Sequence, residues 1–100
     1  MPDLELVAGT LIANRDLYWE VEKEFDALCE RLLQSDEKVL TLDLSRIGFV
    51  FSPYVSRIVR LHVAAKQQGK SLRMLISPRL SELFQLSGLD SELNVELVEE

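Results

Sequence analysis

Short runs of apolar residues alternate with longer stretches in which apolar side chains recur every three or four positions. The apolar runs predict strands over residues 4–13, 38–44, 71–76 and 94–98. The longer stretches predict amphipathic helices over residues 17–33 and 53–68, and a third helix that begins at residue 78. The predicted order of elements is therefore β-α-β-α-β-α-β.

This order favours an α/β fold. We expect a small mixed, mainly parallel β-sheet of four to five strands, flanked by helices and joined by right-handed crossovers. The links between the elements are too short for a second domain, and 100 residues with 47% hydrophobic content suit a single core. We therefore expect one domain over residues 1–100.

The first strand and the first helix contain local signals of their own. Gly9 suggests a bulge or a close backbone approach inside the first strand. Asn14 or Asp16 is expected to cap the first helix, because both side chains accept hydrogen bonds from the free amides of a first turn. The buried stripe of that helix is predicted to contain Tyr18, Val21, Phe25, Leu28 and Leu32.

The second and third helices each begin with a serine followed by a proline. In Ser52-Pro53 and Ser77-Pro78 the hydroxyl suits an N-cap, and the proline suits the first helical position, where its missing N–H has no partner to lose. Gly69 is expected just beyond the end of the second helix, and Gly88-Leu89 at the end of the third. The predicted buried side chains are Val55, Ile58, Val59, His62 and Val63 in the second helix, and Leu80, Leu83 and Phe84 in the third.

Composition narrows the classes of partner. The net charge is −6 and the basic residues are scattered, which argues against nucleic acid. Cys29 is the only cysteine, as suits a reducing compartment. Neither a secretory leader nor an apolar run of about 18 residues is present. We therefore expect a cytoplasmic protein that does not insert into a membrane.

The residue types that most catalytic sites need are scarce. His62 is the only histidine and falls in mid-helix beside apolar neighbours, which is typical of a histidine at the edge of a core. One cysteine and one histidine are too few for a soft-metal site. The sequence also has no glycine-rich phosphate loop and no nucleophile elbow. We expect neither an enzyme, nor a metal centre, nor a cofactor.

Ser52 has two interpretations that the residues alone leave open. A hydroxyl at a helix start is by default a simple cap. The same position also suits a phosphoryl acceptor, because a phosphate there would meet the positive end of the helix dipole and free amides.

Several motifs resemble, in their order and spacing, those of STAS domains, the family typified by bacterial anti-sigma factor antagonists. They are Asp43-Leu44-Ser45, the apolar residues 47–51, Ser52 before a helix, Gly69, Ser77-Pro78 and Leu86-Ser87-Gly88-Leu89. The resemblance covers residues 4–98 and implies a small mixed sheet flanked by helices. In that family a partner kinase, which is also the anti-sigma factor, phosphorylates a serine at the start of the second helix, and the phosphate releases the complex. The resemblance implies that Ser52 takes the place of that serine.

The neighbours of Ser52 depart from the family's Asp-Ser-(Ser/Thr)-Gly pattern. Phe51 replaces the aspartate, Pro53 the second hydroxyl residue and Tyr54 the glycine. Pro53 removes one amide that could have bonded a phosphate, and Tyr54 places a ring where glycine would let a partner's backbone approach. We therefore expect a phosphorylation switch that is weakened or lost on a docking surface that has become more aromatic.

Aromatic residues indicate where a partner would dock. Trp19 falls on the polar side of the first helix, where it either packs on the preceding loop or anchors an interface. Asp43 either lies near Ser52 or bonds a nearby backbone amide and orders its loop. Phe49, Phe51 and Tyr54 would form an apolar patch if all three were exposed. The expected partner-binding residues are Phe49, Phe51, Ser52, Tyr54, Ser56, Arg57 and Trp19.

The leading hypothesis is a cytoplasmic interaction module that docks a regulatory protein, such as an anti-sigma factor with serine kinase activity, through residues 49–57. One alternative is an accessory subunit of a transporter ATPase, as some STAS-like proteins are. A second is a sensor of a small ligand or nucleotide whose phosphate would bind at the helix start of Ser52 or Ser77. A third is a structural domain that assembles with copies of itself.

Overall fold

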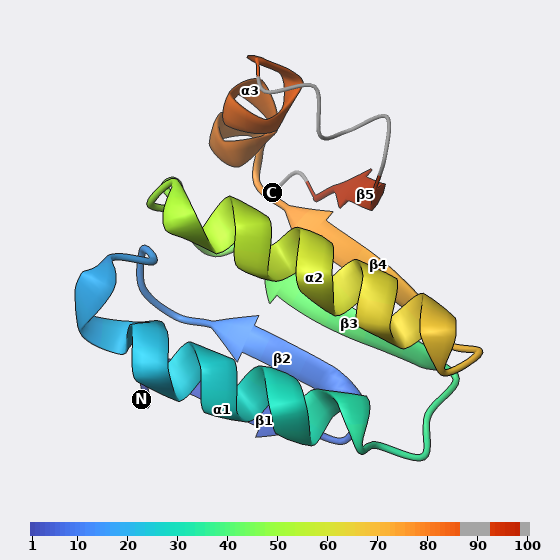
Figure 1. Ribbon diagram of the computed structural model, residues 1–100. Helices are drawn as coiled ribbons and strands as arrows, with labels where there is room; N and C mark the ends of the chain where they lie inside the picture. Colours follow the sequence, from blue (N-terminus) through green and yellow to red (C-terminus); the bar gives the residue numbers. More distant parts are fainter. Residues whose placement is uncertain (87–92, 99–100) are drawn as a thin grey trace.

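The computed structural model describes residues 1–86 and 93–98, and these form a small α/β protein (Figure 1). Its sheet contains five strands in sequence order: β1 (Leu4–Val7), β2 (Thr10–Ala13), β3 (Val39–Leu44), β4 (Ser71–Ile76) and β5 (Asn94–Leu97). The helices are the 3₁₀ turn η1 (Trp19–Val21), α1 (Glu22–Leu33), α2 (Pro53–Gln67) and α3 (Pro78–Leu86). The first strand pair is antiparallel and the other pairs are parallel, so the predicted mixed, mainly parallel sheet flanked by helices is confirmed.

The first predicted strand is a hairpin and not one strand with a bulge, so that expectation was wrong. β1 and β2 pair with Leu4 opposite Ala13, and the chain reverses between them at Ala8 and Gly9. Ala8 has a φ of 53°, a conformation that non-glycine residues adopt uncommonly. A Cβ on Gly9 would lie 2.8 Å from Cγ of Glu37, so the close approach expected of this glycine is present at the turn. Apolar residues continue on both sides of the turn, so the sequence pattern alone does not reveal that the chain reverses there.

The first helix begins later than predicted, and neither expected residue caps it. α1 follows η1, and no side chain caps its first turn. Asp16 instead accepts a hydrogen bond from the Gly48 amide, at 2.9 Å. Asn14 donates to the carbonyl oxygen of Pro2 and to the carboxylate of Glu5, both at 2.9 Å. The two polar side chains therefore hold loops together, and the helix starts without them.

The buried side of α2 is turned relative to the prediction. Tyr54, Ile58, Leu61 and Ala65 are buried at spacings of three and four, whereas 46% of the Val63 surface is exposed. Val55, Val59 and His62 lie at the edges of this stripe, half-buried. At the end of the helix Gly69 has a φ of 75°, which confirms its predicted left-handed conformation.

The third helix starts as its sequence predicts. Ser77 accepts a hydrogen bond from the Leu80 amide at 3.2 Å and donates to the carbonyl oxygen of Ile47 at 2.6 Å. Leu80 and Phe84 are buried, and Leu83 packs against the core from a half-buried position. The expected helix end at Gly88-Leu89 lies outside the described residues.

One hydrophobic core joins the elements. α1 packs on β1, β2 and α2, and α2 packs on β4, so the two helices lie side by side on one face of the sheet (Figure 1). The strand side chains beneath them are buried, among them Leu11, Leu42 and Met74, which lie in register across three strands. In Figure 1, α3 lies beyond the carboxyl end of β4. Among the described residues, no helix is long and apolar enough to cross a membrane.

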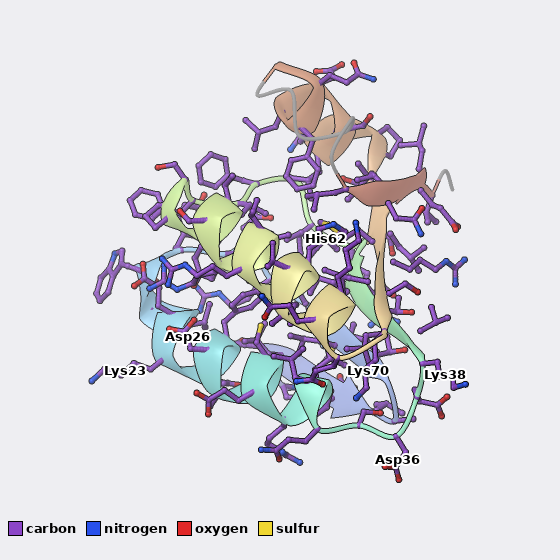
Figure 2. The ribbon with its side chains drawn as sticks, turned by 45° about the vertical axis from the view of Figure 1, so that its right-hand side comes forward. Lys23, Asp26, Asp36, Lys38, His62 and Lys70 are labelled. Atoms are coloured by element: carbon purple, nitrogen blue, oxygen red, sulfur yellow. The ribbon has the colours of Figure 1, made fainter. Side chains whose placement is uncertain are left out.

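Lys70 stabilises the end of α1 from the turn between α2 and β4 (Figure 2). Its ammonium group donates to the carbonyl oxygen of Leu33 at 2.8 Å and to that of Ser35. Carbonyls at a helix end lack partners within the helix, and a cation there also favours the negative end of the dipole.

The Lys70→Met variant should therefore lower the free energy of unfolding by about 1–3 kcal/mol, because it removes two charge-assisted hydrogen bonds. Urea denaturation followed by circular dichroism measures this difference. Lys38→Met is the matched control, because Lys38 is exposed on the neighbouring loop (Figure 2) and should change stability by less than about 0.5 kcal/mol. Equal losses in the two variants would contradict the assigned role of Lys70.

Candidate functional site

The segments that follow β2 and β3 remain paired after those strands end. The Leu17 amide donates to the carbonyl oxygen of Phe49 at 3.1 Å, and the Phe51 amide donates to that of Leu17 at 2.8 Å. These two bonds make a parallel bridge between Leu17 and Val50, whose side chains are both buried. The bridge holds the start of η1 beside the start of α2.

Side chains reinforce this pairing from both directions. Asp16 accepts from the Gly48 amide at 2.9 Å, and Arg46 donates to the Asn14 side chain at 2.7 Å. The Tyr54 hydroxyl donates to the carbonyl oxygen of Tyr18 at 2.5 Å. The two loops are thus bound to each other through main chain and side chains together.

Four aromatic side chains on these loops are exposed: Tyr18, Trp19, Phe49 and Phe51. We refer to them as the aromatic surface. Their exposed fractions are 40%, 72%, 38% and 40%, respectively. The rings of Tyr18 and Phe49 stack with centroids 5.2 Å apart and an angle of 25° between their planes. Phe49, Phe51 and Trp19, three of the residues expected to bind a partner, are therefore exposed.

Tyr18 is a member of this surface that the sequence prediction missed. Its spacing from Val21 and Phe25 suggested the buried stripe of a helix, but the chain at Tyr18 is extended and the helix has not yet begun. The stack with Phe49 and the bridge at Leu17 turn its ring outward into the surface. The aspartate and asparagine that precede it were visible signals, because such residues commonly sit in loops before a helix.

Tyr54 does not belong to the exposed patch, which corrects the prediction. Its exposed fraction is 0%, and its ring meets that of Phe25 edge to face with centroids 5.1 Å apart. Burial raises the pKa of Tyr54 to about 12, and the nearby Glu22 carboxylate adds to this. Phe51 and Tyr54 are neighbours in sequence, but the helix begins between them and turns Tyr54 into the core. Tyr54 therefore supports the surface from beneath.

Arg57 also has a supporting position. Its guanidinium group pairs with Asp26 at 3.0 Å and with Glu22 at 3.3 Å, both on α1, and lies 5.7 Å from the centroid of the Tyr54 ring. Asp26 lies on the side of α1 toward α2, whereas Lys23 points away from the molecule (Figure 2). Arg57 thus links the two helices behind the aromatic surface, and Ser56 next to it is exposed.

Ser52 is exposed and does not cap α2, contrary to prediction. Its backbone is helical, with φ −52° and ψ −35°, and its hydroxyl makes no capping hydrogen bond. The amides that follow are already engaged: that of Tyr54 donates to the carbonyl oxygen of Phe51 at 2.9 Å, and that of Val55 to Ser52 at 3.0 Å. Pro53 has no amide hydrogen. The free amides that a phosphate would need are therefore missing from these positions.

Asp43 orders its own loop. It accepts hydrogen bonds from the amide and the hydroxyl of Ser45, at 3.0 and 2.6 Å. Its neighbours Leu42 and Leu44 are buried beneath the helices, and successive side chains of a strand point to opposite faces. Asp43 therefore projects from the face opposite α2 and not toward Ser52, so the second of the two interpretations of Asp43 holds.

Cys29 and His62 are residue types that could take part in catalysis or bind a metal. Burial and the nearby Asp26 carboxylate raise the pKa of Cys29 to about 12, so its thiol is a poor nucleophile at neutral pH. The Nδ1 atom of His62 is buried without a hydrogen-bond partner among the described residues. Within the same residues, no three His, Cys, Asp or Glu side chains are grouped as metal ligands.

No protein-family model matches this chain, and no curated protein matches its sequence significantly. The function must therefore be argued from the geometry of the aromatic surface and from the loops that hold it. That geometry combines exposed rings with loops that are hydrogen-bonded to each other.

The Tyr54→Phe variant tests the bond that joins α2 to η1. Loss of the hydroxyl leaves the Tyr18 carbonyl without its donor and should cost about 1 kcal/mol at pH 7. Because the folded state raises the pKa from about 10 to about 12, Tyr54 stabilises the fold fully below pH 10 and progressively less as the pH rises toward 12. Tyr54→Phe should therefore lose less stability than the parent between pH 9 and 11.

Denaturant unfolding at pH 7, 9 and 11 measures both effects. Tyr18→Phe is the control, because its ring is partly exposed and its main-chain carbonyl stays in place. If the stability of Tyr54→Phe and of the parent protein depends on pH in the same way, folding does not raise the pKa of Tyr54.

Proposed function

We propose that this protein is a binding module that docks a partner protein through the aromatic surface. The observation that carries the proposal is the exposure of Tyr18, Trp19, Phe49 and Phe51 on paired loops. Exposed apolar patches on small proteins mark interaction sites, and tryptophan and tyrosine are favoured in the centres of interfaces.

The loops beneath the surface favour tight binding because they are ordered in advance. Binding through flexible loops costs conformational entropy, which a preorganised surface avoids. Here the bridge at Leu17, the Asp16–Gly48 bond and the buried Tyr54 hold the rings in place. Little of the free energy gained when the rings contact a partner would therefore be lost in ordering the loops.

The resemblance to STAS domains suggests which class of partner the protein binds. The mixed sheet, with a helix that begins at Pro53 directly after Ser52, is compatible with that family. On this basis we place the protein in the cytoplasm as an anti-sigma factor antagonist-like regulator, with an anti-sigma factor as the partner. An accessory role beside a transporter ATPase would use the same surface, and the identity of the partner distinguishes the two.

The proposal includes a phosphorylation switch at Ser52 that is weakened or lost. The hydroxyl is exposed, but the first turn of α2 has no amide at Pro53 and uses those of Tyr54 and Val55 internally. A phosphate on Ser52 would therefore gain less from the helix start than one that meets free amides.

Trp19→Ala and Phe51→Ala should each weaken partner binding at least about tenfold, or about 1.4 kcal/mol, since each removes an exposed ring from the contact. Affinity capture from the host identifies the partner, and titration of the purified pair measures Kd. Val63→Ala is the matched control, because Val63 is exposed on α2 but lies outside the aromatic surface. If both aromatic variants bind like the parent protein, this surface is not the docking site.

Ser52 should carry no phosphate in protein recovered from its host. Intact-mass analysis of the recovered protein tests this, with Ser52→Ala and Ser56→Ala as paired variants, because both serines are exposed near the start of α2. An added phosphate that only Ser52→Ala removes would show that the switch survives despite its altered neighbours.

A further inference from the structure

A second surface feature involves the residues that directly precede Phe49. It is a pocket between the segment after β3 and the start of α3, at the carboxyl ends of β3 and β4. The argument concerns Arg46, Gly48, Ser77 and Arg79 among its lining residues. The carboxyl ends of parallel strands are where α/β proteins commonly bind ligands.

The described residues that line this pocket carry positive charge, although the chain has a net charge of −6. Arg46 and Arg79 both line it, and none of the other described lining residues is charged. Arg46 donates only to the neutral side chain of Asn14, and Arg79 has no hydrogen-bond or ion-pair partner in the described part of the chain. By contrast, Arg15, Arg57 and Arg73 each pair with carboxylates.

Two carboxylates near the pocket, those of Asp16 and Asp43, form no ion pair with either arginine in the described part of the chain. Asp16 accepts a hydrogen bond from the Gly48 amide. Asp43 lies at the end of β3, where both donors of Ser45 bond its Oδ1 atom. The hydroxyl of Ser77 is likewise engaged by Ile47 and Leu80. The charged groups of the described lining that remain for an anionic ligand are therefore the two guanidinium groups.

Gly48 leaves the space in which the Arg79 side chain packs. A Cβ at Gly48 would lie only 2.6 Å from Cδ of Arg79, so the arginine stem packs directly over the glycine. The Gly48 amide is itself held by Asp16. The absence of a side chain at position 48 thus makes the room that Arg79 occupies at the edge of the pocket.

We propose that this pocket binds a small anion that carries a phosphate group, with Arg46 and Arg79 as its ligands. Guanidinium groups present several donors in a plane and bind phosphate oxygens in pairs. A dianion would also relieve the repulsion between two cations that line one pocket. The proposal is independent of the aromatic surface, because none of its four rings lines the pocket.

Titration with inorganic phosphate tests the proposal, with ionic strength held constant by sodium chloride and amide shifts followed by NMR. We expect saturable shifts centred on Gly48 and Arg79. Arg46→Gln and Arg79→Gln should each weaken binding at least about tenfold, as loss of a charged partner does. Arg60→Gln should bind like the parent protein, because Arg60 is exposed on α2 and does not line this pocket.

Gly48→Ala tests whether the position of Arg79 matters in addition to its charge. It keeps both arginines, but its methyl group displaces Arg79, so phosphate binding should weaken while the net charge is unchanged. If this variant does not fold, the two glutamine variants of exposed arginines still decide the question. Absence of saturation, or equal weakening in Arg60→Gln, would overturn the proposal, because the shifts would then report a general charge effect.

A parallel titration with adenosine monophosphate distinguishes the source of the phosphate group. Tighter binding than that of inorganic phosphate would show that the rest of an organic ligand also makes contacts. Equal binding would show that the pocket takes the phosphate group alone. Both results support an anion site, provided that Arg79→Gln weakens the binding of both ligands.

Discussion

The hydrogen bonds between Leu17 and the loop after β3 are the interaction on which the aromatic surface depends. They continue the parallel pairing of β2 and β3 beyond the ends of the strands, so that two loops behave as an extension of the sheet. Main-chain groups in these loops would otherwise need water as a partner. Because they pair with each other instead, the aromatic residues on either side are placed by the same framework as the core. The rest of the site, including the Tyr18–Phe49 stack, follows from that framework.

The sequence was most informative where one local signal determines the structure. Ser77 with Pro78 starts a helix, and Gly69 ends one, since each effect depends on a few adjacent atoms. Strand and helix types were likewise predictable, because apolar periodicity reflects burial on one or both sides. The coarse α/β architecture followed from these elements.

Sequence reasoning failed where residues distant in the chain compete for the same group. Asp16 has the chemistry of a cap, but the Gly48 amide 32 residues away uses its carboxylate. Ser52 has the same local signal as Ser77, yet α2 starts directly after Phe51, whose amide donates to the carbonyl oxygen of Leu17. Tyr54 looked like part of a patch because sequence proximity does not reveal where a helix turns inward. The sequence suggested the helix start of Ser77 as a possible phosphate site but not the two arginines beside it, because Arg46 follows β3 and Arg79 belongs to α3.

The closed hydrogen bonding at the start of α2 has a thermodynamic consequence for association. A helix start with free amides attracts anions, and its complexes respond to salt. Here the amides of Tyr54 and Val55 are engaged, and uncharged rings form the adjoining surface. Association on that surface would then be driven by the removal of apolar area from water. Its signature would be a negative heat-capacity change with little dependence on ionic strength.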